Sequence, residues 1–252
     1  MEELCDVLFE LSNSERIRII SILKDERLKL SGVSKRLEIT VTEASRHLQR
    51  LSEKEFIAKD SESLYYVTPY GNLIFSLLPA IGFVSENRKY FLEHDTSVLP
   101  PEFVARFGEL SGTVYSEDTI SNFAYEEKMI REATDYCWSA ANQFHWSAPP
   151  IVVDVMKRGV DVRSILPEKL TLPVGFRPAE GVNRRTLPEF NLVVIVTERE
   201  AVFGLPYLNS RMDYAQYRGK KPSFIKWCND LFQYLWDRAK PMIGPFTNTR
   251  LE

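Results

Sequence analysis

Cysteine and histidine are scarce in this chain of 252 residues, which contains three of each. Cys5, Cys137 and Cys228 lie far apart and form no CxxC pair or Cys/His cluster. The sequence therefore predicts no metal site and no disulfide framework, because both need such residues at close and regular spacing. Free cysteines of this kind fit a protein of the reducing cytoplasm.

Sequence motifs of catalysis are missing as well. Glycine numbers 11 and is scattered, and the chain has no GxxxxGK(S/T) phosphate loop. It also has no GxSxG elbow for a nucleophilic serine and no HExxH zinc motif. Glu126 and Glu127 are neighbours on an expected helix, where adjacent side chains diverge, so we expect both to lie in solvent. The sequence thus favours a protein that is not an enzyme and uses no cofactor.

Neither a long hydrophobic run nor a strong charge excess is present. The most apolar stretch, residues 73–84, is shorter than the roughly eighteen apolar residues of a membrane span. With 32 basic and 35 acidic residues the net charge is −3, which argues against a protein that coats nucleic acid everywhere. Residues 29–59 differ, with seven basic residues against four acidic ones. Any contact with DNA is therefore expected to be local to this segment.

Residues 31–57, within that segment, have the pattern of two short helices joined by a tight turn. Thr40 followed by Glu43 has the spacing of a capping box, which predicts that the second helix begins near Val41. Apolar residues at helical spacing give each helix one face to bury. These residues are Val33, Leu37 and Ile39, followed by Ala44, Leu48 and Leu51. The pattern predicts a helix-turn-helix.

The second of these helices keeps several polar side chains off its apolar stripe. They are Thr42, Ser45, Arg46, Gln49 and Arg50. Arginine can bind guanine O6 and N7 and glutamine can bind adenine N6 and N7, so we expect Arg46 and Gln49 to contact bases. Thr42, Ser45 and Arg50 are expected to position the helix on the sugar-phosphate backbone. The alternative is an ordinary solvated helix face.

A β-hairpin is expected directly after the helix-turn-helix, with strands at residues 56–59 and 64–68 around the turn sequence DSES. Such a hairpin is the wing of a winged helix. Its tip is too acidic to grip phosphates well, so we expect the wing to add little affinity unless Lys59 or Ser61 reaches the DNA backbone, and Lys59 is the wing residue assigned to that contact.

Residues 70–93 are expected to form a long helix that is too apolar for a solvated linker. We expect it to form a homodimer interface, because two half-sites on DNA require a two-fold symmetric reader. The alternative is that it packs on the following domain. Pro79 and Gly82 are expected to bend or break it midway. The predicted domains are a DNA-binding domain at 1–68, a linker or dimerisation helix at 69–95 and an effector domain at 96–252.

Strands and helices alternate in the second half, which predicts an α/β domain with a parallel or mixed sheet. The expected strands are 114–116, 136–141, 160–166, 192–197 and 201–205, and the expected helices are 120–134, 150–158 and 222–239. Ligands in such sheets bind beyond the carboxyl ends of strands. A ligand site is therefore expected around Trp138, Asn142 and His145, although large aromatic residues are more often core. Arg184 and Arg185, in an expected loop, could hold a phosphate or carboxylate.

Three stretches resemble two known families. SRHLQRL at residues 45–51, followed by a wing, resembles the recognition helix of ArsR-type winged-helix proteins. FGLPYLNSRMDYAQY at 203–217 and WCNDLFQYLWDRAKP at 227–241 resemble the effector domain of archaeal methanogenesis regulatory proteins. This resemblance implies a dimeric archaeal transcription regulator whose second domain is similar to the phospholipase-D-like fold. The HxKx4D motif of the hydrolases with that fold is absent, and so are the paired cysteines of ArsR-type metal sensors.

The leading hypothesis is a homodimeric, sequence-specific regulator that binds double-stranded DNA and senses a small anionic metabolite through its second domain. One alternative is an enzyme acting on a phosphodiester or nucleotide, with His145 or Asn142 in its active site and the winged helix as a targeting module. Another is an assembly protein that contacts the basal transcription machinery and binds no ligand. None of these involves a membrane.

Overall fold

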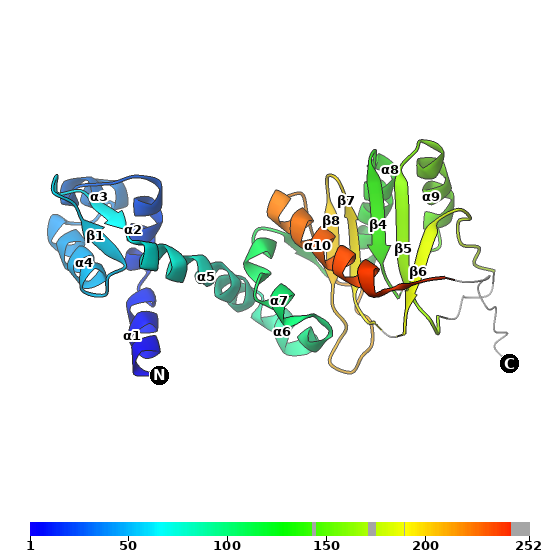
Figure 1. Ribbon diagram of the computed structural model, residues 1–252, viewed down its shortest axis with the longest axis horizontal. Helices are drawn as coiled ribbons and strands as arrows, with labels where there is room; N and C mark the ends of the chain where they lie inside the picture. Colours follow the sequence, from blue (N-terminus) through cyan, green and yellow to red (C-terminus); the bar gives the residue numbers. More distant parts are fainter. Residues whose placement is uncertain (143–144, 171–174, 189, 243–252) are drawn as a thin grey trace. The chain divides into compact units, whose positions relative to one another are not determined.

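The computed structural model describes residues 1–142, 145–170, 175–188 and 190–242. The chain divides into two compact units, Met1–Pro79 and Ala80–Glu252, which we call unit 1 and unit 2 (Figure 1). Within the described ranges, no helix combines the length and apolarity needed to cross a membrane.

Unit 1 is a winged helix, as the sequence predicted. Its elements are α1 (Glu2–Leu11), α2 (Ser14–Asp25), α3 (Leu30–Leu37), α4 (Val41–Glu53), β1 (Ile57–Lys59) and β2 (Tyr65–Val67). Helix α4 packs against α2, α3 and β1. The centre of this core is formed by Ile19, Ile20, Leu23, Val33, Ala44, Leu48, Leu51, Phe56 and Ile57.

The start of α4 is fixed by the predicted capping box, which is confirmed. The Thr40 side chain accepts a hydrogen bond from the Glu43 backbone nitrogen at 3.2 Å, and the Glu43 carboxylate accepts one from the Thr40 backbone nitrogen at 3.0 Å. These bonds satisfy two backbone donors that the first turn of a helix leaves without partners. The hydrogen bonds that the Glu43 carboxylate accepts from the Thr40 backbone nitrogen and hydroxyl lower the pKa of Glu43. The helix begins at Val41, at the position expected from the sequence.

The wing is also confirmed. Strands β1 and β2 pair antiparallel, with Ile57 opposite Val67 and Lys59 opposite Tyr65. The Asp60 side chain closes the turn by accepting hydrogen bonds from two backbone nitrogens, those of Glu62 and Leu64, at 2.9 Å each.

Pro79 and Gly82 were expected to bend or break the helix here, but helix α5 (Pro69–Glu86) continues through both residues, so a break was wrong. Pro79 is exposed, and water can therefore satisfy the carbonyl that lacks a partner because proline has no N–H. The helix ends before Asn87 instead, and α6 (Arg88–Glu93) follows. Phe83 and Tyr90 are buried in the core of unit 2, so residues 80–95 of the expected linker or dimerisation helix pack with that unit.

Unit 2 contains a mixed sheet, which confirms the predicted α/β class. Its strands are β3 (Val114–Ser116), β4 (Tyr136–Ala140), β5 (Asp161–Pro167), β6 (Asn183–Leu187), β7 (Val193–Thr197), β8 (Ala201–Gly204), β9 (Gln216–Gly219) and β10 (Lys240–Pro241). Their order in the described part of the sheet is β10-β6-β5-β4-β7-β8-β9-β3. Strands β4, β5 and β6 are parallel neighbours, and the other pairs are antiparallel.

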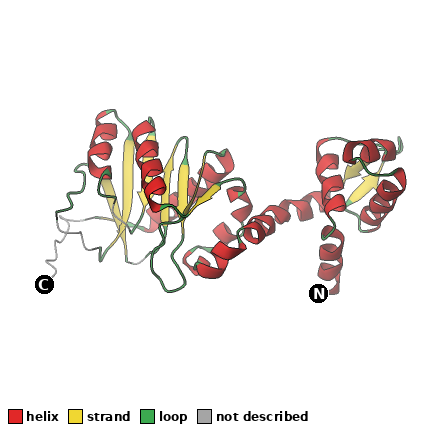
Figure 2. Cartoon of the chain, turned by 180° about the vertical axis from the view of Figure 1, so that it is seen from behind, coloured by secondary structure: helices red, strands yellow, loops and turns green. Residues whose placement is uncertain are grey.

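Helices cover both faces of this sheet. Helix α10 (Pro222–Arg238) lies on one face, and α8 (Thr119–Glu132) and α9 (Ala148–Lys157) lie on the other (Figures 1 and 2). Short helical segments α7 (Pro101–Val104), η1 (Thr96–Val98) and η2 (Phe107–Leu110) precede β3. Side chains alternate along each strand, so Val194 and Val196 of β7 join the core under α10, while Val193 and Ile195 join the core under α8 and α9.

Candidate nucleic-acid interface and ligand cavity

Helix α4 presents a polar face to solvent. Thr42, Ser45, Arg46 and Gln49 are all exposed. On the opposite side Ala44, Leu48 and Leu51 are fully buried. This division follows from the sequence, because apolar residues at helical spacing can be buried only by turning the intervening polar residues outward.

The exposed side chains differ in what they already contact. Gln49 donates a hydrogen bond to the Glu53 carboxylate at 2.9 Å, one helical turn further along α4. Arg46 makes no hydrogen bond or ion pair with any residue that the structure describes. The N–H donors of its guanidinium are therefore available to a molecule outside the chain.

Arg50 is held by an acid that sequence reasoning missed. Its guanidinium donates two hydrogen bonds to Glu10 of α1, the Nε–Oε2 bond measuring 3.0 Å, and it lies over the ring of Phe9. Glu10 is buried and also forms an ion pair with Arg16 at 3.2 Å. The hydrogen bonds from Arg50, followed by the charge of Arg16, lower the pKa of the Glu10 carboxyl. Arg50 therefore ties α4 to α1, which differs from the phosphate contact expected for it.

The wing offers one exposed cation. Lys59 is exposed on β1, with Nζ 5.5 Å from the centroid of the Tyr65 ring. At the acidic tip, Asp60 forms an ion pair with Arg27 at 3.3 Å. This ion pair offsets part of the tip's negative charge, although Glu62 remains exposed beside it.

His47 is buried behind the polar face of α4, and burial lowers its pKa. Among the described residues, no group of histidines, cysteines and acids is placed to hold a metal ion.

Unit 2 contains a cavity of about 160 Å³ between its sheet and the two helices α8 and α9. Its wall is mostly apolar, with contributions from Phe123, Ile130, Val152, Val162, Phe176, Val193 and Ile195. The polar side chains of the wall are Glu126, Ser139, His145, Ser164 and Arg184.

The structure separates the residues expected to form a ligand site. His145 and Arg184 line the cavity. Trp138 stacks on Phe232 of α10, which places it on the other face of the sheet. The guanidinium of Arg185 likewise lies over a ring of α10, that of Trp236, 4.4 Å from the ring centroid.

Two further expectations about these residues need correction. Asn142 donates a hydrogen bond to Asn191 at 2.6 Å and does not line the cavity. Arg184 and Arg185 belong to strand β6, so the loop expected there was wrong. Successive residues of a strand point to opposite faces, which is why one arginine reaches the cavity and the other reaches α10.

Glu126 was expected in solvent, and this was wrong. It lies on the sheet side of α8 and is 8% exposed. Burial raises the pKa of its carboxyl to about 7, against a smaller opposing effect of the hydrogen bond with Gln216. Its neighbour Glu127 is half-buried, and its Oε1 lies 3.7 Å from Nε2 of His145. The helical stripe of Asn122, Glu126, Met129 and Ile130 was the available signal for burial.

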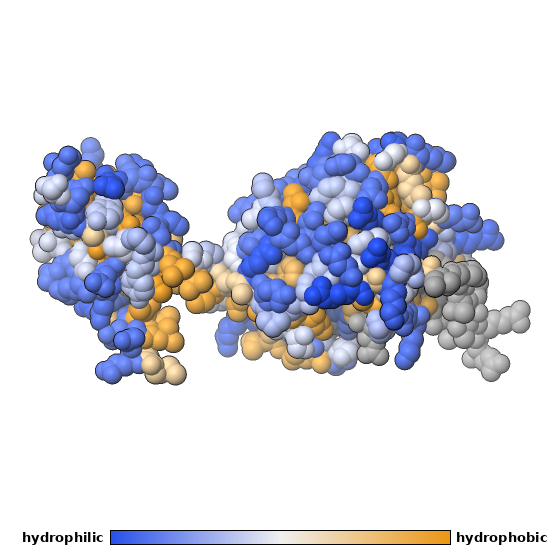
Figure 3. Space-filling view, viewed as in Figure 1, coloured by the Kyte–Doolittle hydropathy of each residue, from blue (hydrophilic) through white to orange (hydrophobic). Residues whose placement is uncertain are grey.

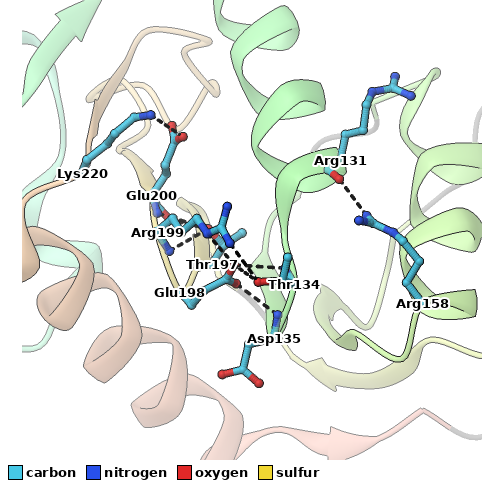
Figure 4. A network of polar contacts seen from close by, with 9 residues as sticks. All are labelled: Arg131, Thr134, Asp135, Arg158, Thr197, Glu198, Arg199, Glu200 and Lys220. Atoms are coloured by element: carbon cyan, nitrogen blue, oxygen red, sulfur yellow. Dashed lines mark hydrogen bonds and ion pairs between the residues drawn. The ribbon is translucent and has the colours of Figure 1, made fainter.

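A polar network holds the β7–β8 turn to the start of β4 (Figure 4). Glu198 accepts hydrogen bonds from the Thr134 backbone nitrogen at 3.0 Å and the Thr134 hydroxyl at 2.9 Å. Arg199 lies beside the same carboxylate, with Nε 3.3 Å from Oε1. These charges neutralise one another, so we assign the network to the stability of the sheet.

Comparison with known proteins gives similarities to solved structures only. No family model and no curated protein matches the sequence. The structure of TrmBL2, an archaeal chromatin protein, aligns over 86% of this chain and 88% of its own length, with 16% identity and a TM-score of 0.43. Nuc from Salmonella typhimurium, a phospholipase D family member, aligns over 52% of this chain and 97% of its own, with 16% identity and a TM-score of 0.39.

A third similar structure is the homodimeric winged helix-turn-helix domain of Mb0332 from Mycobacterium bovis, described as a possible ArsR-family regulator. It aligns over 33% of this chain and 81% of its own, with 18% identity and a TM-score of 0.31. Identities and scores at this level describe likeness of fold and establish no function.

Replacing Glu126 by glutamine should change how stability depends on pH. The carboxyl has a pKa of about 7 when folded and 4.5 ordinarily, so the folded state binds the proton more tightly. The free energy of unfolding should therefore fall as pH rises from 4.5 to 7, by on the order of 3 kcal/mol. Glu126→Gln should lack this loss and gain stability over the wild type as pH rises.

Urea unfolding at pH 5 and pH 8 measures this difference. Glu132→Gln is the control, since Glu132 is exposed on the same helix. A Glu126→Gln variant that shifts with pH by the same amount as the wild type would contradict the assignment.

Proposed function

We propose that this chain is a sequence-specific DNA-binding regulator. The observation that carries the proposal is the exposed polar face of α4 in a winged helix, with an arginine that has no partner among the described residues. An α-helix of this kind fits the major groove, where arginine and glutamine side chains can distinguish base pairs.

The proposed roles follow from the contacts of each side chain. Arg46 reads a base, and Gln49 reads another by exchanging its weak, solvent-exposed bond to Glu53 for an adenine edge. Thr42, Ser45 and the wing residue Lys59 bind the sugar-phosphate backbone. We assign Arg50 to holding α4 in place, because its guanidinium already donates two hydrogen bonds to Glu10 of α1.

We further propose that the regulator is a homodimer. Helix α1 exposes Leu4, Leu8 and Phe9, and α5 exposes Leu73 and Leu77. Figure 3 shows hydrophobic side chains over α1 and along the start of α5. Exposed apolar residues that gather on neighbouring helices favour association, and a second copy would supply the two-fold symmetry that paired half-sites need.

We propose that unit 2 is the sensor domain of this regulator. Its cavity is closed to one side by the sheet and has the mixed apolar and polar wall typical of small-molecule sites. A ligand that binds two arrangements of the dimer with different affinity would shift the regulator between them.

Replacing Arg46 by alanine should reduce specificity. A duplex selected from a random pool by the wild type provides the probe, and fluorescence anisotropy gives its affinity beside that of a scrambled duplex. Arg46→Ala should lose about 1–3 kcal/mol on the selected duplex through one base position, with little change on the scrambled one.

Arg88→Ala is the matched control, because Arg88 is an exposed arginine of α6 in unit 2. It should leave both affinities unchanged. Equal losses of Arg46→Ala on both duplexes would show a general phosphate contact and refute base reading by this residue.

Placing a charge on the apolar face of α5 should separate the dimer. The wild type should have a mass near twice the 29.2 kDa of one chain in light scattering, and Leu77→Glu should have the mass of one chain. Loss of the dimer should also weaken binding to the selected duplex, since a single winged helix then contacts a single half-site.

Asn72→Glu is the control, since Asn72 is exposed on another face of α5. It should remain dimeric. A wild type with the mass of a single chain at micromolar concentration would exclude the dimer.

A further inference from the structure

The cavity of unit 2 has the size of a site for one small apolar molecule. Its volume of about 160 Å³ is close to the roughly 150 Å³ of an engineered apolar cavity that binds benzene. Apolar side chains from α8, α9 and strands β5 and β7 form most of its wall. Apolar surface of this kind favours a compact hydrocarbon group.

Glu126 stands out in this wall because it is a carboxyl group in apolar surroundings. No salt bridge joins it to any cation in the described part of the chain, and the polar group that acts on its pKa is the neutral side chain of Gln216. A buried carboxylate without a cation is costly, which is why the group holds its proton to near neutral pH. A ligand that carried a positive charge to this position would remove that cost.

The other polar groups of the wall already have partners within the protein. Ser139 and Ser164 lie on the sheet with their hydroxyl oxygens 3.3 Å apart. The guanidinium of Arg184 donates a hydrogen bond to the backbone carbonyl of Ala179. His145 pairs with Glu127. The group whose charged form still lacks a counter-ion is therefore Glu126.

We infer that this cavity binds a small primary amine with a compact apolar body, such as an aromatic ring, and that Glu126 receives its ammonium group. The apolar body would lie against residues such as Ile130 and Val193, and the ammonium N–H groups would donate to the carboxylate. An anionic ligand is disfavoured, because it would gain nothing from Glu126 and would have to compete for the Arg184 guanidinium, which already donates to the Ala179 carbonyl. The binding itself does not depend on DNA, whereas a role in regulation rests on the proposed function.

The affinity should depend on pH, because the amine pairs with ionised Glu126. Below the pKa of about 7 the carboxyl must first lose its proton, so affinity should fall about tenfold for each pH unit below that value. Other titratable groups near the carboxyl do not reverse this trend. Burial raises the pKa of Cys137 to about 12 and lowers that of His145. Arg184 also faces the cavity, and Asp213 lines the adjoining space and forms a pair with His94.

Calorimetric titration of the full chain without DNA tests the inference. The probes are 2-phenylethylamine, the neutral 2-phenylethanol and the anionic 3-phenylpropanoate, which share a ring and a similar length. At pH 7.5 the amine should bind at least about tenfold more tightly than either of the others, and its affinity should decline at pH 5.5. No heat with the amine, or tighter binding of the anion, would overturn the inference.

Variants locate the site. Glu126→Gln should weaken the amine at least about tenfold, whereas Glu132→Gln on the exposed side of α8 should not. Val152→Trp, which fills the cavity from α9, should abolish binding of the amine and keeps the test valid if Glu126→Gln does not fold. Unchanged binding in Glu126→Gln or in Val152→Trp would refute the site.

The affinity of the unliganded protein for the selected duplex is measured separately. If the protein does not bind DNA, the amine titration still tests the cavity. If the protein does not bind the amine, the DNA measurement still tests the proposed function.

Discussion

The burial of one side of α4 is the constraint on which the proposed DNA reader depends. Ala44, Leu48 and Leu51 are fully buried against α2, α3 and β1. Burial of one leucine side chain contributes about 1.5–3 kcal/mol, which exceeds the typical contribution of an exposed polar contact. The apolar stripe therefore sets the rotation of the helix about its axis, and the capping box at Thr40 sets where the helix starts. Because the rotation and the start of α4 are both fixed, Arg46 must lie on the exposed face of this helix.

A second interaction links this reader to α1. Glu10 joins Arg16 of α2 and Arg50 of α4, and Lys54, directly after α4, pairs with Asp6 at 2.6 Å. Helix α1 also exposes Leu4 and Leu8, which we propose as part of the dimer interface. Within unit 1, a displacement of α1 would therefore act directly on α4 through charged hydrogen bonds. This gives the proposed dimer a physical route to control the angle of the reader.

Local signals allowed much of unit 1 to be predicted from sequence. Apolar spacing located the helices, and Thr40, Glu43 and the turn residues of the wing located their ends, because each of these signals acts over a few residues. The same is true of the apolar strands β7 and β8. Strand β6 was missed because its sequence, NRRTL, has no apolar alternation, and it forms a strand by pairing with β5 and β10, which are distant in sequence or not recognisable as strands.

Long-range effects account for the remaining errors. The burial of Glu126 depends on the sheet beneath α8, which is assembled from segments far apart in the chain. Glu10, the partner of Arg50, lies forty residues earlier in the chain, and no short sequence motif predicts this pairing. Side chains of β6 reach opposite sides of the sheet, so the two adjacent arginines could not be assigned to a single site without the strand. The roles of charged residues that make such long-range contacts can be assigned only from the structure.

The most direct measurement of the central claim is hydrogen–deuterium exchange of the full chain with and without its selected duplex. Exchange of backbone amides reports local opening and its suppression by a bound partner. DNA held by the outer face of α4 should slow exchange in peptides that cover residues 41–53 and the wing. Protection confined to unit 2, with exchange in residues 41–53 unchanged, would contradict the account.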